Sequence, residues 1–401
     1  MAEAVDNIWE LIPTDVLSEV LLCLPHNCRR QSRLVCRLWR DAVDTSRTEM
    51  RSRPKTLVTT SSSVRLVADL PQWSSSHGSA PSGAELWTGS AYNCTELWTG
   101  SAYNGMSFVG TCNGLICMCH RDNHYMPLIL SNPVTGETLV IPPAPVTYME
   151  VGSYSYLMYS FAYHPTTGRY KIVHVPHCFG NRVWVFTLGE KVWREVATGC
   201  HKETYYDQPK GIVSIDGAVC WAMYAVHGME AMVMFFDLDS EHIESIRLPL
   251  PNVSSSSSWH LTEAHGRLGV AFTNESSMSD NIDVWVMEHA TAGQQRMWSR
   301  LYNIHMQKPR VWQLEQHELT QPYFTHDGEY ILTMRWNLSQ AFCILYKHKL
   351  RNDGKNTWRG VVEIDEKNEG TVVAYISASY HRRRTFAYFE TNEPLSVYRC
   401  S

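Results

Sequence analysis

Five tight turns recur along the C-terminal two thirds of the chain, and each carries a glycine between runs of β-branched and aromatic residues. The turn glycines are Gly114, Gly168, Gly217, Gly266 and Gly328, so successive turns are 54, 49, 49 and 62 residues apart. An Asn-Gly or Asp-Gly pair between such runs is a strong local signal for a β-hairpin. The repetition therefore predicts an all-β domain built from similar sheet units.

The spacing of the turns indicates which all-β architecture to expect. A period of about 50 residues with two hairpins per unit is typical of a kelch-type β-propeller blade. A four-stranded blade cannot bury both faces alone, so we expect about six blades closed into a ring. The last hairpin, 372–377 with 385–389, lacks two strands. Residues 55–60 and 64–67 could supply them, which would lock the two ends of the domain together.

Composition and charge limit the classes of function. The chain is 44% hydrophobic, 19% charged and 11% aromatic, which fits a β domain and argues against disorder. A net charge of -5 gives no general attraction to nucleic acid or to anionic membranes, and we expect neither as a partner. The polar first ten residues do not resemble a signal peptide. We therefore expect the 12 cysteines to be reduced thiols, in the cytoplasm and/or the nucleus.

Residues 8–50 have a different, helical pattern. Thr14 can cap a helix after Pro13, and apolar residues then follow at helical spacing. The first stripe is Val16, Leu17, Val20, Leu21 and Leu24, and the second is Leu34, Val35, Leu38, Trp39 and Ala42. Helices below about 12–15 residues are marginal in water. The stripes must therefore pack on something else, either the larger domain of the same chain or a partner protein.

This module resembles an F-box. The likeness is carried by residues 11–17, by Leu24-Pro25, and by 33–40, which reads Arg-Leu-Val-Cys-Arg-Leu-Trp-Arg. One departure is Cys28-Arg29-Arg30, where such boxes often carry Leu-Leu between the helices. The resemblance implies a small all-α module that binds the Skp-type adaptor of a Skp–cullin–F-box ubiquitin ligase and, through it, a cullin.

The resemblance also implies which side chains contact the adaptor. By position in the box, the set is Leu11, Pro13, Leu17, Val20, Leu21, Leu24, Pro25, Leu34, Val35, Cys36 and Trp39. Trp39 is the natural anchor, because buried tryptophans dominate interface energies. Arginines crowd residues 29–53. We interpret them as a solvated face or a rim toward an acidic adaptor, in preference to a nucleic-acid arm.

The β domain resembles the F-box-associated domain of large plant F-box families. The motifs that carry this likeness are 132–137 (Asn-Pro-Val-Thr-Gly-Glu), 163–171 (Tyr-His-Pro-Thr-Thr-Gly-Arg-Tyr-Lys) and 235–238 (Phe-Phe-Asp-Leu). The resemblance implies that the propeller holds a protein substrate for ubiquitination. Its binding residues are not identified by the sequence. The tryptophans Trp184, Trp221, Trp285 and Trp336 are predicted to be blade core.

A Ser/Gly-rich linker joins the two parts. Within it, residues 85–93 recur as 96–104, a tandem duplication with a period of 11 residues. We expect the second copy to form the native strand and the first to lengthen the loop, because long loop insertions cost little free energy. The predicted divisions are 1–7, a disordered N-terminus; 8–50, the F-box; 51–105, a strand plus linker; and 106–395, the propeller.

Catalytic motifs do not stand out. Cys112, Cys117, Cys119 and His120 lie close in sequence but lack the second, distant pair of a zinc site. The His174, His177 and Cys178 cluster has no adjacent carboxylate. Nucleophile-elbow, phosphate-loop and His-Glu-x-x-His motifs are missing from the sequence. We therefore expect a non-catalytic receptor with no cofactor and no metal. A propeller hydrolase or oxidase with an appended helical module is the alternative.

Overall fold

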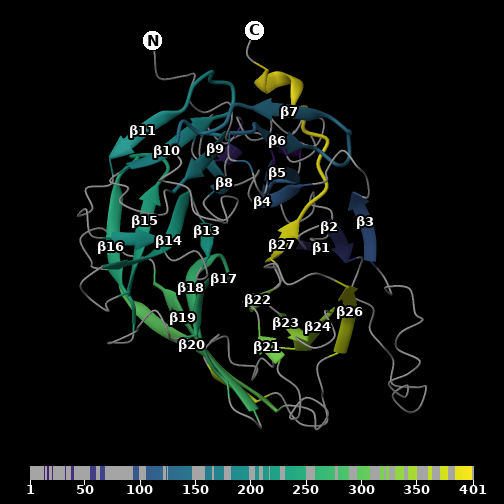
Figure 1. Ribbon diagram of the computed structural model, residues 1–401, viewed down its shortest axis with the longest axis vertical. Helices are drawn as coiled ribbons and strands as arrows, with labels where there is room; N and C mark the ends of the chain where they lie inside the picture. Colours follow the sequence, from purple (N-terminus) through teal and green to yellow (C-terminus); the bar gives the residue numbers. More distant parts are fainter. Residues whose placement is uncertain are drawn as a thin grey trace.

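The computed structural model describes most of the β domain and a few residues of the N-terminal module. The described residues are 13, 16–17, 20, 32, 38–39, 55–59, 64–67, 94–98, 105–120, 123, 125–146, 159–164, 167–175, 182–197, 204–206, 211–215, 217–225, 231–249, 258–275, 279–288, 296–307, 317–319, 322–324, 330–337, 342–349, 360–363, 371–377 and 384–399. Within them, the strands form six sheets arranged as a ring (Figure 1).

The first two sheets are simple antiparallel meanders. One has the order β4 (Met106–Cys112), β5 (Leu115–His120), β6 (Leu128–Ser131) and β7 (Thr138–Ile141). The next has β8 (Tyr159–His164), β9 (Arg169–His174), β10 (Arg182–Thr187) and β11 (Arg194–Ala197). In both, strands adjacent in sequence are adjacent in space, as expected for propeller blades.

The following three sheets each have five strands. The third contains β12 (Thr204–Tyr206), β13 (Ile212–Ile215), β14 (Ala218–Ala225), β15 (Ala231–Asp237) and β16 (Ile243–Arg247). The fourth contains β17 (Trp259–Ala264), β18 (Arg267–Glu275), β19 (Ser279–Met287), β20 (Trp298–Gln307) and β25 (Gly360–Glu363), which is parallel to β20. The fifth contains β21 (His317–Leu319), β22 (Tyr323–Phe324), β23 (Tyr330–Asn337), β24 (Phe342–Lys349) and β26 (Thr371–Ser377).

The remaining sheet is composite and joins the two ends of the domain. Its order is β27 (Arg384–Tyr388), β1 (Lys55–Thr59), β2 (Val64–Val67) and β3 (Cys94–Trp98). The prediction that 55–60 and 64–67 complete a sheet with the last strand is therefore confirmed.

The predicted hairpin of 372–377 with 385–389 is wrong. Strand β26 pairs with β24 instead, in a register that runs from Phe342↔Ser377 to Lys347↔Thr371. The fourth place in the composite sheet goes to β3, which holds the first residues of the second duplicated copy, as predicted. The first copy, 85–93, lies outside the described residues. Five blades thus come from residues 106–377 and one sheet combines both chain ends, which makes the fold a β-propeller. The kelch-type class stays a prediction.

The inner strands meet around the centre of the ring. Strands β27, β4, β8, β13, β17 and β22 contact one another in that order. Four predicted turn glycines lie within the described residues, and each has a positive φ at the turn that follows its inner strand. The values run from +70° at Gly168 to +83° at Gly114. Gly328 lies outside the described residues.

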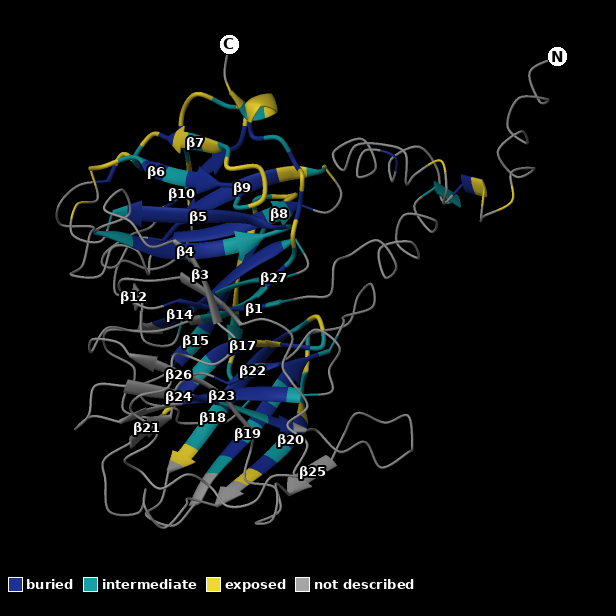
Figure 2. Cartoon of the chain, turned by 90° about the vertical axis from the view of Figure 1, so that its right-hand side faces the viewer, coloured by how far each residue is buried: buried dark blue, intermediate teal, exposed yellow. Residues whose placement is uncertain are grey.

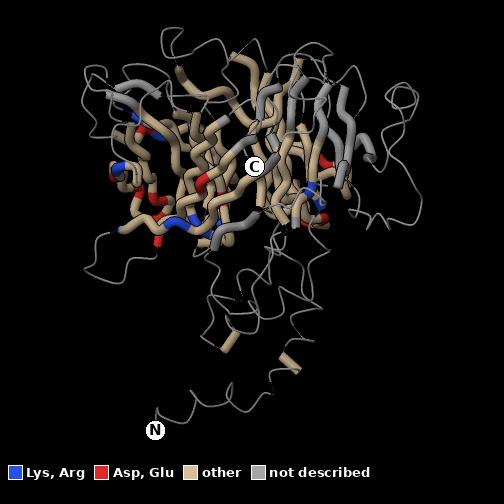
Figure 3. The backbone as a smooth tube through the Cα atoms, turned by 90° about the horizontal axis from the view of Figure 1, so that it is seen from below, with Lys and Arg blue, Asp and Glu red and all other residues tan. Residues whose placement is uncertain are grey.

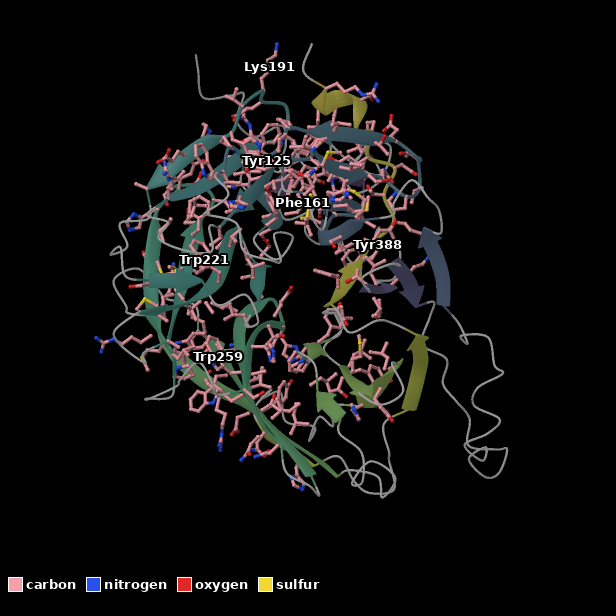
Figure 4. All side chains as sticks on the ribbon, viewed as in Figure 1. Tyr125, Phe161, Lys191, Trp221, Trp259 and Tyr388 are labelled. Atoms are coloured by element: carbon pink, nitrogen blue, oxygen red, sulfur yellow. The ribbon has the colours of Figure 1, made fainter. Side chains whose placement is uncertain are left out.

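Apolar side chains fill the gaps between neighbouring sheets. Figure 2 shows the buried positions concentrated in the strands, and Figure 4 shows Phe161, Trp221, Trp259 and Tyr388 among them, with Lys191 at the outside. Trp221 is fully buried, and Trp184 packs at the edge of the core between the first two sheets, as predicted. Trp285 is half-buried, and the side chain of Trp336 lies outside the described set.

The second and third sheets are clamped together by an ion network. Glu241, in the turn between β15 and β16, has a φ of +52°. Its carboxylate accepts hydrogen bonds from Arg194 Nη1 at 2.7 Å and from Lys171 Nζ at 2.9 Å. Lys171 is buried and also donates to the Leu238 carbonyl. The Arg194 hydrogen bond, aided by Lys171, lowers the pKa of Glu241 from 4.5 to about 2, against the opposing effect of burial.

Replacing Glu241 with Gln tests this clamp. A carboxyl group with a lowered pKa stabilises the fold above its unfolded-state pKa, and this stabilisation is lost as the pH falls from 4.5 toward 2. We expect the wild-type protein to melt at a higher temperature than Glu241→Gln at pH 7, with the difference shrinking below pH 4.5. Calorimetry at several pH values measures it. A difference that stays constant down to pH 3 would contradict the linkage.

The N-terminal strand β1 should be essential to the propeller. Leu57 is fully buried and packs in a cluster with Phe108 and Ile116 of the first sheet. Replacing it with Ala removes buried volume, which should lower the free energy of unfolding by about 2–5 kcal/mol. The matched control is Lys55→Ala, because the half-exposed ion pair of Lys55 with Glu390 contributes about 1 kcal/mol or less. Denaturant titration checks both. If Leu57→Ala lowered the free energy of unfolding as little as Lys55→Ala does, β1 would contribute little to the stability of the propeller.

Candidate functional site

Part of the first predicted helix lies within the described residues. The Leu17 amide donates a hydrogen bond to the Pro13 carbonyl at 3.0 Å, an i→i−4 bond of the α-helical type. Val16, Leu17 and Val20 are helical, as are Ser32, Leu38 and Trp39 in the second predicted helix. Within the part of the chain that the structure describes, no helix is both long and apolar enough to cross a membrane.

The described residues separate two faces of the first helix. Val16 and Val20 are 48% and 47% exposed, and residues four apart share one helix face. Leu17 is only 1% exposed, so it belongs to the interior of this chain. Val16, which is not in the predicted contact set, therefore joins Val20 on the accessible apolar surface. The sequence pattern could not separate the two faces, because all three residues fall in one stripe.

The other predicted contact residues are only partly placed. Pro13 is exposed and Trp39 is half-buried. The residues that lie outside the described set are Leu11, Leu21, Leu24, Pro25, Leu34, Val35 and Cys36. The arginine-rich stretch lies outside it as well. The contact set as a whole stays a prediction.

The predicted motifs of the propeller contact one another. Lys171 ends the motif 163–171, and its ammonium donates to the carbonyl of Leu238, which ends the motif 235–238. In the same region, His164 Nε2 lies 3.1 Å from Asp239 Oδ1. Basic and acidic residues of the described part lie close together along the rim (Figure 3). These motifs hold blades together, a role that their local sequence pattern does not reveal.

The cysteine and histidine candidates are packed into the fold. Cys117 and Cys119 are buried on one face of β5, in the core between the first two sheets. Burial raises the pKa of both thiols. Among the described residues, no group of three or more His, Cys, Asp or Glu could hold a metal ion. His174 is buried and packs edge-on against Tyr159, whereas His177 and Cys178 lie outside the described set.

The buried thiols should be inert in the native protein. Reaction needs the thiolate, and Cys117 and Cys119 are held protonated by burial. We expect iodoacetamide at pH 8 to leave both unmodified in folded protein and to label both after denaturation. Peptide mass spectrometry measures the labelling. Native labelling of Cys117 at the denatured rate would contradict its burial.

The fold defines a β-propeller protein with an N-terminal helical module, and comparison with known proteins gives its family. Residues 64–388 match the F-box associated beta propeller domain, and residues 9–49 match the F-box domain. The chain therefore belongs to the family of proteins with an F-box associated β-propeller domain, and it carries an F-box in front of that domain.

Relatives of this chain occur in Arabidopsis thaliana. One putative F-box protein is 24% identical over 50% of this chain and 49% of its own length, so the chain spans about half of that relative. A second putative F-box protein is 26% identical over 72% of this chain and 70% of its own length. Among solved structures, an oligogalacturonate lyase in complex with manganese is 12% identical and covers 60% of this chain and 76% of its own. Its TM-score of 0.30 is too low to carry an argument.

Proposed function

We propose that this chain is the substrate-recognition subunit of a Skp–cullin–F-box ubiquitin ligase. The F-box binds the Skp-type adaptor, the adaptor joins the cullin, and the propeller holds a protein substrate. The observation that carries the proposal is the presence of an F-box and an F-box associated propeller in one chain. The exposed pair Val16 and Val20 is consistent with it, because the two valines share one helix face that is open to a partner.

The mechanism we propose is tethering. Binding the substrate and the adaptor on one chain raises the effective concentration of the substrate near the ubiquitin donor. The chain itself carries out no bond chemistry and acts in the cytoplasm and/or the nucleus. A rigid ring suits this role, because substrate-binding loops need a fixed support.

Adaptor binding is tested by changing the exposed helix face. A double variant, Val16→Asp with Val20→Asp, places two charges on the proposed contact surface. We expect at least about a tenfold loss of adaptor recovery, since each 1.4 kcal/mol of binding free energy is a factor of ten. The measurement is co-purification of adaptor and cullin with tagged chain from plant cells, quantified by mass spectrometry.

The matched control is Val192→Asp, a valine of the propeller that is 66% exposed. It should retain the adaptor at the wild-type level. Trp39→Ala should lose it, because truncating a central aromatic typically costs about 2–4 kcal/mol of binding free energy. Equal recovery of adaptor with all variants would overturn the proposal, provided that each variant melts like the wild type.

A further inference from the structure

A segment near the C-terminus, residues 389–399, leaves the innermost strand of the composite sheet and crosses two other blades. Strand β27 ends at Tyr388, which is also where the family match ends. All eleven following residues are described, and their contacts reach the first and the second sheet. We propose that residues 389–399 are a strap that closes the ring a second time, by fastening β27 to the blades beside it.

The strap passes first over the turn between β4 and β5. Gly114 sits in that turn with a φ of +83°. A Cβ atom there would overlap both the Phe389 carbonyl oxygen and the side chain of Thr391. The glycine is therefore needed twice, for the backbone conformation of the turn and for the passage of the strap.

Asn132 is the second contact, and it is fully buried. Its side-chain amide donates to the Thr391 carbonyl at 3.0 Å and to the Glu393 carbonyl at 2.8 Å. Its side-chain oxygen accepts from the Val134 amide at 2.9 Å, which shapes the β6–β7 turn. One side chain thus fixes the turn and holds the strap, with both amide hydrogens and the oxygen used.

Glu393 is the third contact, and its carboxylate needs hydrogen-bond donors around it. It is 1% exposed, and a buried carboxylate is costly unless it accepts strong hydrogen bonds. Tyr170 Oη of β9 donates to it at 2.7 Å, and Tyr398 Oη of the strap donates at 2.5 Å. The two tyrosine rings pack edge to face with centroids 5.9 Å apart. The second sheet therefore presents a site for one acidic side chain of the strap.

An apolar anchor completes the strap. Leu395 is fully buried in the core between the first two sheets, and its amide donates to Glu137 Oε2 at 2.6 Å. Glu137 ends the motif that starts at Asn132, and Tyr170 lies in the motif 163–171. The motif residues Asn132, Glu137 and Tyr170 thus form a receiving surface for the C-terminal segment of their own chain.

Ring closure gives the strap its role. The composite sheet is the only one, among the described sheets, that pairs strands from both ends of the chain, through β1 and β27. Because the strap leaves β27 after Tyr388, fastening it to the first two sheets keeps β27 in register for β1. Release of the strap should therefore separate β27 from β1 before the strands of the other sheets separate.

Hydrogen exchange on the full-length Glu393→Gln variant tests the strap. The amide of Gln offers a donor where the site needs a second acceptor, so one tyrosine hydroxyl loses its bond. We expect the backbone amides of β27 and β1 to exchange at least about tenfold faster than in wild type, while those of β18 and β19 stay unchanged. The matched control is Glu390→Gln, because Glu390 is an exposed residue of the same strap and its ion pair with Lys55 lies at the surface. It should exchange like wild type.

Two results would overturn the proposal. One is unchanged exchange in β27 and β1 of Glu393→Gln. The other is equal acceleration in all sheets, which would make Glu393 a general stability residue. If Glu393→Gln does not fold, Tyr170→Phe removes a single hydrogen bond from the same carboxylate and should give the same local pattern at smaller size. The absence of that pattern would count equally against the strap.

Discussion

The pairing of β1 with β27 is the interaction on which the rest of the structure depends, because a ring of sheets has no stable form until its ends meet. The two strands pair antiparallel over five residues each, from Lys55↔Tyr388 to Thr59↔Arg384. Leu57 and Tyr388, one from each strand, are buried in the same cluster with residues of the first sheet. This closure places β1, which follows the F-box in sequence, beside the innermost strand of the composite sheet. The F-box and the propeller are therefore joined by a structural strand as well as by a linker.

The local pattern of the sequence predicted the repeated parts of this fold. Turn glycines between β-rich runs identified the inner hairpins at Gly114, Gly168, Gly217 and Gly266, and the missing strands were placed correctly at 55–59 and 64–67. Such features depend on neighbours in sequence, so a single sequence reveals them. Strand β26 could pair with either β24 or β27, and it pairs with β24. The alternation of residues does not distinguish these two partners.

The site features that the sequence missed are long-range contacts. Asn132 belongs to the motif 132–137, but its partners Thr391 and Glu393 lie about 260 residues away. Lys171 likewise belongs to one motif and contacts the end of another, at Leu238. In the helical module, Leu17 and Val20 looked equivalent by spacing, yet one is buried and the other exposed. Spacing gives a stripe, and only packing divides the stripe into an inner and an outer face.

In the proposed function, the helical module is the surface that joins this chain to an adaptor, while the propeller stays free for a substrate. Hydrogen exchange of the full-length chain, with and without a purified Skp-type adaptor, measures this most directly. We expect slower exchange confined to residues 11–39, with the amides of β4–β20 unchanged. Protection on the propeller sheets, or no protection anywhere at saturating adaptor, would contradict it.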